Sequence, residues 1–121
     1  MYLSYKIIIN IFKIESIDLN HMKLNTKQRK YLKALSHHIK PRINIGKDGL
    51  TEGVILSINE HIEKKELIKI KFSQNKENKT DISLLICDKV KCKQVYIIGN
   101  NLIVYKKSSN PKYCQIELPM T

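Results

Sequence analysis

The chain has 121 residues, of which 42% are hydrophobic and 27% are charged, and its formal net charge at pH 7 is +11. This length suffices for one domain with a single core, and this composition excludes an intrinsically disordered chain. The excess of positive charge favours a polyanionic partner, either nucleic acid or an anionic membrane surface. Three cysteines without CxxC spacing argue against a zinc site and indicate reduced thiols in a cytoplasmic protein.

Residues 1–21 are expected to form a flexible or loosely docked extension outside the fold. Their apolar centre, IIINIF, is interrupted by Asn10 and followed by charged residues. It lacks the roughly 20 apolar residues of a spanning helix and the features of a secretory signal. An amphipathic surface anchor stays open as an alternative. The segment from Met22 reads as a complete domain, so we place the folded domain at 22–121.

The first helix is predicted over residues 26–38. Asn25 is a favourable N-cap, and Gln28 three residues later completes a capping-box pattern. Pro41 prevents the helix from continuing. The alternating residues 42–45 that follow predict a short strand.

Helices and strands then alternate along the rest of the chain. The predicted elements are a helix at 51–64, a strand at 66–72, a loop at 73–79, a helix at 80–91, two strands at 94–98 and 102–105 around a hairpin turn, and a short strand at 114–119. The order α-β-α-β-α-β-β predicts a compact α/β sandwich with helices against a small sheet.

The positive charge is concentrated in one segment. Between residues 23 and 47 there are eight basic side chains and no acidic one, whereas residues 52–66 contain four acidic side chains against two lysines. An unbalanced run of this kind favours a polyanion-binding face over an ordinary solvated one. The candidate binding residues in this run are Lys27, Arg29, Lys30, Lys33, Lys40 and Arg42.

Three of the four glycines lie within eight residues, at positions 46, 49 and 53. Gly46 and Gly49 flank two residues between the predicted strand and the next helix, where free N–H groups and the helix dipole suit a phosphate. An ordinary tight turn is the alternative interpretation. Lys47 within the loop and the basic segment before it favour a phosphate clamp. Gly53 is expected to permit close packing or close approach of RNA.

Other phosphate-binding motifs fit less well. GKDGLT lacks the earlier glycine of a nucleotide-hydrolysing P-loop, and the three glycines are not spaced GxGxxG. A KH domain also clamps nucleotides with an I-G-x-x-G loop, but that loop joins two helices, whereas a strand is predicted here.

The chain resembles the YhbY-type, single CRM-domain RNA-binding proteins. The resemblance rests on LNTKQRKYLKALSHHIKP, IGKDGLTEGV, KKELIKIKF, QVYIIGNNLIVYK and IELP, in that order. It covers residues 24–119.

The resemblance implies three helices packed on a four-stranded mixed sheet, similar to the C-terminal domain of bacterial translation initiation factor three. It also implies RNA binding through a GxxG loop and the adjacent basic surface and, for bacterial single-domain members, association with precursors of the large ribosomal subunit. Gly46, Lys47, Asp48 and Gly49 would form the RNA loop. Asp48 departs from the uncharged residue often found there, and we expect it to cap the following helix.

Several other residues could carry chemistry. His37 and His38 are expected to interact with the helix dipole or with phosphates rather than with a metal. Structural roles are expected for His61, Tyr31, Tyr96 and Tyr105.

The sequence therefore predicts a non-enzymatic, cytoplasmic, monomeric RNA-binding protein of large-subunit assembly. It is predicted to have no catalytic residues, no metal, no cofactor, no small-molecule substrate and no membrane contact. The alternatives are a KH-like binder of small or messenger RNA, an enzyme acting on RNA, and a membrane-surface protein anchored through residues 1–21.

Overall fold

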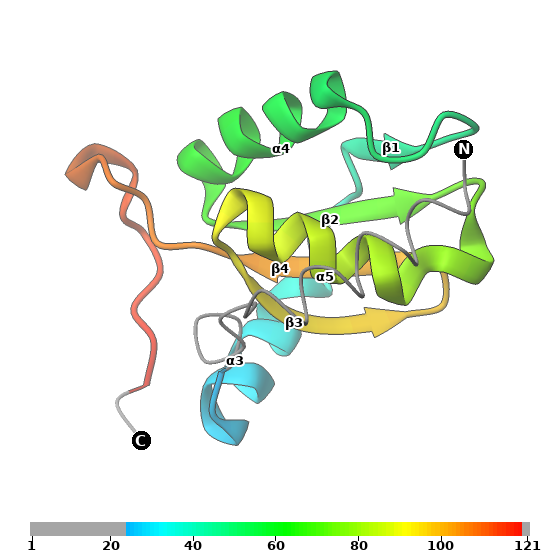
Figure 1. Cartoon of the computed structure of the whole chain (residues 1–121). Helices are drawn as coiled ribbons and strands as arrows, with labels where there is room; N and C mark the ends of the chain where they lie inside the picture. The colour runs from blue at the N-terminus through cyan, green and yellow to red at the C-terminus, as the bar shows by residue number, and fades with distance from the viewer. Residues whose placement is uncertain (1–23, 120–121) are drawn as a thin grey trace.

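The computed structural model describes residues 24–119 (Figure 1). The predicted extension at 1–21 lies outside this range. The elements are α3 (Thr26–Ser36), β1 (Ile43–Ile45), α4 (Glu52–Lys65), β2 (Leu67–Phe72), the short 3-10 helix η1 (Lys76–Asn78), α5 (Lys79–Val90), β3 (Lys93–Ile98), β4 (Asn101–Tyr105) and the 3-10 helix η2 (Pro111–Tyr113). Their order confirms the predicted α/β sandwich.

The four strands form one mixed sheet in the order β1-β2-β4-β3. β1 runs parallel to β2, while β4 runs antiparallel to both β2 and β3. The short strand β1 therefore lies at an edge of the sheet. The loop that follows β1 and leads into α4 lies at that same edge (Figure 1).

The sheet has a hydrophobic core on each face, because side chains alternate along a strand. Leu102 and Val104 of β4 belong to the core that α4 and α5 cover, together with Ile70 of β2. Ile103 of β4 belongs to the second core, where Leu32 of α3 packs. The helices thus lie with α4 and α5 on one face and α3 on the other (Figure 1).

Two local sequence signals form as predicted. The side chain of Asn25 accepts a hydrogen bond from the Gln28 backbone N–H at 2.8 Å, and the Gln28 side chain accepts one from the Asn25 N–H at 3.2 Å. Between β3 and β4, Ile98 pairs with Asn101 around a two-residue turn in which Gly99 has a φ of +57°. Glycine at this position is the requirement of a type II′ hairpin.

Two sequence predictions are wrong. Residues 114–119 form no strand. Tyr31, for which a structural role is expected, is 40% exposed, and Leu35, four residues later on α3, is 36% exposed. By contrast, Tyr105 is buried, and Tyr96 is half-buried beneath α3, where its hydroxyl lies 3.3 Å from the Ser36 hydroxyl.

A buried carboxylate holds the C-terminal segment instead of strand pairing. Glu66 ends α4 in the left-handed region with a φ of +66° and is fully buried. Its carboxylate accepts backbone N–H bonds from Ser108, Gln115 and Ile116 at 2.8 to 3.1 Å. These charge-assisted bonds satisfy the buried charge and fix the C-terminal segment against the end of α4.

Candidate nucleic-acid interface

The loop between β1 and α4 is a tight turn that requires one glycine. The backbone N–H of Gly49 donates to the carbonyl of Gly46 at 3.1 Å, and Gly49 has a φ of +69°. A side chain in this left-handed conformation would cost roughly 1–2 kcal/mol. Gly49 is therefore needed for the shape of the loop itself.

Gly46 has no comparable requirement. Its φ lies outside the left-handed region, and an added Cβ would meet only the Asn44 amide at 3.7 Å and the Ser73 hydroxyl at 3.9 Å. Both are ordinary van der Waals distances. The fold would tolerate alanine at this position, and Gly46 is half-buried.

A buried asparagine keeps the loop in place. Asn75, which follows β2, takes the left-handed conformation with a φ of +58°. Its side-chain amide donates to the carbonyl of Gly46 at 2.8 Å and approaches the carbonyl of Lys47 at 3.3 Å. Sequence reasoning missed this residue. The only available signal was that asparagine tolerates left-handed turns.

The predicted capping role of Asp48 is wrong. The N-cap of α4 is Thr51, whose hydroxyl accepts a hydrogen bond from the Val54 backbone N–H at 3.2 Å. α4 begins at Glu52, so Asp48 lies too far before the first turn to cap it. Asp48 and Lys47 are both exposed, and the tip of the loop thus carries one acidic and one basic side chain.

Gly53 is exposed in the first turn of α4, and the packing explanation for it is also wrong. An added Cβ would meet only the Thr51 hydroxyl at 3.8 Å. Close approach of an external molecule stays a prediction for this position.

The basic residues predicted on α3 are exposed, but they do not surround the loop. Lys33 extends over the ring of Tyr96, with its ammonium 4.9 Å from the ring centroid. Figure 1 shows α3 below the sheet and the 46–49 loop beyond the far end of β1. The other exposed basic residues of this helix are Lys27, Arg29 and Lys30.

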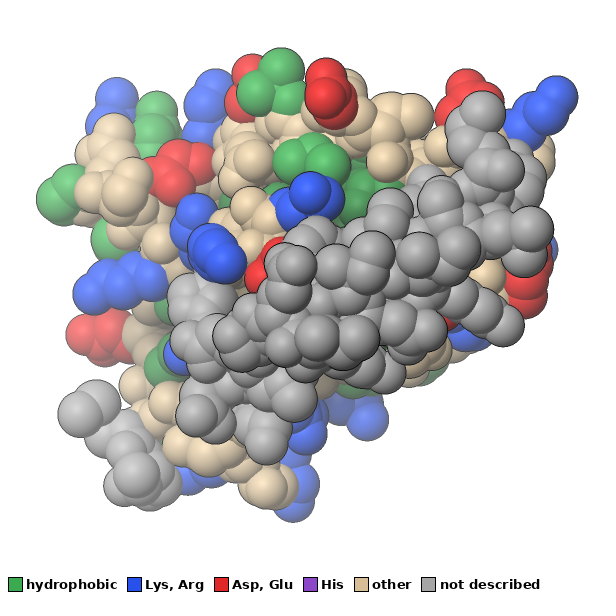
Figure 2. All heavy atoms as spheres, viewed as in Figure 1, with side chains coloured by type: hydrophobic (Ala, Val, Ile, Leu, Met, Phe, Trp, Pro, Cys, Tyr) green, Lys and Arg blue, Asp and Glu red, His purple; other side chains and the backbone are tan. Residues whose placement is uncertain are grey.

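Lys40 and Arg42 lie between α3 and the loop, in the segment that leads into β1, and both are exposed. Figure 2 shows acidic and basic side chains next to one another on this face of the molecule, so the uneven charge of the sequence is not separated into two surfaces in this view.

A shallow groove runs along β1 and the adjoining face of α4. One hollow of about 470 Å³ lies at the start of α4 and is bordered by Asn44, Gly53 and Ser57. A second hollow, of about 290 Å³, continues past Ser57 to His61. Arg42 borders both hollows. The groove therefore follows α4 away from the glycine loop with a guanidinium at its side.

Two structural features are absent from residues 24–119. Within residues 24–119, there is no group of three or more His, Cys, Asp or Glu side chains placed to hold a metal ion. Within the same range, no helix combines the length and the apolar character needed to cross a membrane.

Comparison with known proteins identifies the family of the chain. The model of the CRS1 / YhbY (CRM) domain matches residues 24–106, which is more than half of the chain. The chain belongs to the CRM domain family. The resemblance noted in the sequence is thereby confirmed, and the glycine loop, the groove and α3 are parts of this CRM domain.

Two similar proteins are matched over almost their whole length. The chain is 37% identical over 97 residues to the Bacillus subtilis protein named probable RNA-binding protein YqeI, covering 79% of this chain and 99% of that protein. It is 40% identical over 97 residues to a Haemophilus influenzae protein named RNA-binding protein, covering 79% and 95%.

A solved structure shares the fold. The solution structure of the Staphylococcus aureus protein SAV1595 matches with a TM-score of 0.68 at 35% identity, covering 80% of this chain and all of that protein. Three helices on a four-stranded mixed sheet are therefore the architecture of this CRM domain and of its structural neighbour.

Proposed function

We propose that this CRM domain is a non-enzymatic module that binds structured RNA, and specifically ribosomal RNA in precursors of the large subunit. Membership of the CRM family and the names of its relatives support RNA as the partner. In this proposal residues 22–121 form the RNA-binding domain, which acts as a monomer in the cytoplasm.

The observation that carries the proposal is Gly46. Neither its backbone conformation nor the surrounding atoms require glycine, yet its carbonyl is fixed by the buried Asn75 amide. Because Gly46 is half-buried and carries no side chain, the sugar-phosphate chain of RNA can approach the backbone there more closely than at a residue with a Cβ. Gly46, Lys47, Asp48 and Gly49 are the residues that we assign to this contact.

The net charge of the loop is zero, because Asp48 offsets Lys47. Attraction of phosphates must therefore come from the positive end of the α4 dipole and from basic side chains outside the loop. Arg42 and Lys40 approach it along β1. The exposed lysines and arginine of α3 would contact a second part of a folded RNA, on the other side of the sheet.

Sedimentation of a cell lysate through a sucrose gradient tests the ribosomal assignment. The protein should migrate with large-subunit precursors in low salt and be released in high salt, because phosphate contacts are screened. Lys47→Gln should weaken the association, whereas Lys107→Gln, an equal loss of charge after β4 and away from the loop, should not. Migration at the top of the gradient in both salts would refute the ribosomal role and direct the search to small or messenger RNA.

A further inference from the structure

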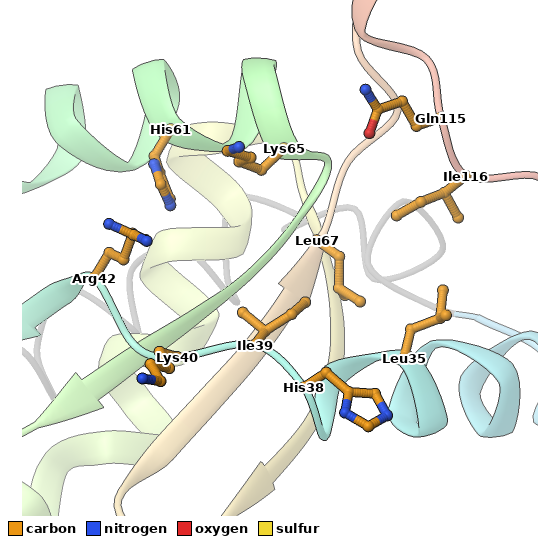
Figure 3. A pocket seen from close by; sticks show the side chains of 10 residues that line it. All are labelled: Leu35, His38, Ile39, Lys40, Arg42, His61, Lys65, Leu67, Gln115 and Ile116. Atoms are coloured by element: carbon orange, nitrogen blue, oxygen red, sulfur yellow. The ribbon is translucent and has the colours of Figure 1, made fainter.

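The largest of the described hollows lies beyond the end of the groove, in a place that the glycine loop does not reach. It is a cavity of about 560 Å³, within the range of roughly 300–1,000 Å³ typical of small-molecule sites. Its lining comes from five separate segments: the end of α3, the connection to β1, the end of α4, the start of β2 and the C-terminal segment (Figure 3).

The buried carboxylate of Glu66 holds one wall of the cavity in place. Gln115 and Ile116 line the cavity, and their backbone N–H groups are the ones that donate to Glu66. Leu67, the next residue along from Glu66, is buried and lines the cavity as well. The wall is thus tied to the sheet by the same charge-assisted bonds that position the C-terminal segment.

The cavity is divided into an apolar part and a basic part. In Figure 3 the side chains of Leu35, Ile39, Leu67 and Ile116 gather on one side. Leu35 is 36% exposed, so this apolar surface is accessible to a ligand. Aliphatic side chains around an accessible hollow favour a flat apolar group that can displace water from them.

The basic part lies on the other side of the cavity, where Arg42 and His61 point toward each other (Figure 3). Lys40 and Lys65 complete it, and the lining includes neither aspartate nor glutamate. Burial lowers the pKa of His61, and the nearby positive charges of Arg42 and Lys65 lower it further. This side of the cavity therefore suits an anion.

The apolar side of the cavity also contains one neutral polar group, the side-chain amide of Gln115. Gln115 lines the cavity with a carboxamide, which offers both a carbonyl oxygen and an NH₂ group. A free phosphate would use only the basic part of the cavity. A nucleotide would use all three features: its base on the aliphatic side chains, its base edge on the carboxamide and its phosphate at the guanidinium.

We propose that this cavity holds one unpaired nucleotide of the RNA that the CRM domain binds, with the base between Leu35, Ile39 and Ile116 and the phosphate at Arg42. The inference rests on the proposed RNA-binding function and adds a second contact to it. Single-stranded or bulged bases are the parts of RNA that side chains can reach. The site would select RNA with an extruded base over a continuous duplex.

The groove along α4 connects this site to the glycine loop. Arg42 borders the cavity as well as both hollows of the groove. From Gly53 to His61 the helix rises by about 12 Å, at roughly 1.5 Å per residue. One RNA strand held at the loop could therefore follow α4 and place a neighbouring nucleotide in the cavity.

The test uses the full chain and two variants with the same substitution. Leu35→Gln removes an apolar side chain from the cavity, and Leu56→Gln removes one that is 59% exposed on α4 and does not line the cavity. Leucine and glutamine have similar helix propensities, so both variants should fold. The probes are adenosine 5′-monophosphate and inorganic phosphate, each followed at millimolar concentration by amide chemical shifts in NMR spectra.

The nucleotide should shift the amides of Ile39, Gln115 and Ile116, and Leu35→Gln should weaken its binding by about threefold to tenfold, as expected for the loss of a partly buried leucine. Leu56→Gln should leave the affinity for the nucleotide unchanged. The proposal is overturned if phosphate binds as tightly as the nucleotide and Leu35→Gln has no effect, because the cavity is then an anion site only. Absence of shifts in the cavity also overturns it.

A second arm separates this inference from the proposed function. An RNA duplex of two strands with one bulged nucleotide and the fully paired duplex are compared by filter binding. Leu35→Gln should weaken binding of the bulged duplex alone, while Lys47→Gln should weaken binding of both duplexes. If Lys47→Gln weakens binding of both duplexes and Leu35→Gln binds them as Leu56→Gln does, the cavity proposal fails and the RNA-binding function stands. If neither duplex binds but the nucleotide does, the RNA-binding function fails and the cavity still binds a nucleotide.

Discussion

Replacing Gly46 and Gly49 separately by alanine would distinguish a glycine that shapes the loop from one that admits RNA. Gly49→Ala places a Cβ on a residue with a φ of +69°, which costs roughly 1–2 kcal/mol. For a domain of this size, 1 kcal/mol corresponds to a change of about 4–8 °C in Tm. We therefore expect Gly49→Ala to lower Tm by about 4–16 °C.

Gly46→Ala should behave differently. The added Cβ would have neighbours no nearer than 3.7 Å, and the backbone conformation is one that alanine adopts freely. Alanine also restricts the unfolded chain, which stabilises a protein by about 0.4–1 kcal/mol where the native conformation is compatible. We expect a Tm equal to or slightly above that of the wild type, together with RNA binding weakened about tenfold, because the methyl group would occupy the space next to the phosphate chain.

Thermal unfolding by circular dichroism and RNA binding at one fixed salt concentration are the two measurements. Gly99→Ala is the control for the strain, since Gly99 has a φ of +57° in the β3–β4 turn and the substitution should lower Tm as Gly49→Ala does. Wild-type RNA affinity in Gly46→Ala, with unchanged Tm, would refute close approach of RNA to this loop. An unchanged Tm in Gly49→Ala would refute the assigned strain.

Three further predictions concern salt, the loop support and pH. The logarithm of RNA affinity should fall linearly with the logarithm of salt concentration. Lys47→Gln should make this slope shallower by about 0.7, the value for one phosphate contact with a single strand. An identical slope in the variant would contradict the contact of Lys47 with a phosphate. Asn75→Gly keeps the left-handed conformation but removes the amide that donates to the carbonyl of Gly46, which retains the N–H of Gly49 as a donor. Stability measured in urea should therefore fall by about 0.5–1.5 kcal/mol, the contribution of one hydrogen bond, and unchanged stability would refute the supporting role of Asn75. The pKa of His61 is lowered in the folded state by burial and by Arg42 and Lys65, so the unfolded chain binds the proton more tightly. The stability that neutral His61 contributes is therefore present above its unfolded pKa of 6.5 and is lost as pH falls below that value. The free energy of unfolding of His61→Gln, measured in urea, should depend less on pH in that range than that of the wild type. Equal pH dependence in both proteins would refute the lowered pKa of His61.

The sequence determined the elements whose signals act over a few residues. Asn25 and Gln28 cap α3 as predicted, because each side chain reaches the other residue's backbone within one turn. Gly99 marks the hairpin because only glycine takes its φ without cost. The unbalanced charge of residues 23–47 is likewise a property of the sequence. The element order and the α/β class were correctly predicted from local signals of this kind, and the CRM family was correctly predicted from the resemblance of longer stretches of the sequence.

Side-chain exposure and the ends of elements depended on contacts that the sequence does not display. The spacing of Tyr31 and Leu35 is that of a buried stripe, but burial requires a neighbour, and the sheet covers only part of α3. Thr51 rather than Asp48 caps α4, because the turn closed by Gly49 delays the helix start. Residues 114–119 have β-forming side chains but are held by Glu66 instead of a partner strand.

The candidate sites divide in the same way. The loop residues are contiguous, so their spacing alone placed a glycine loop between the predicted strand and the next helix, with an ordinary tight turn as the alternative to a phosphate clamp. The cavity was missed because its lining comes from positions 35 to 116, and residues far apart in sequence are brought together only by the sheet and by the bonds of Glu66. Local hydrogen bonding and charge are encoded in short stretches of the sequence, whereas a cavity between five segments exists only after the hydrophobic cores have packed.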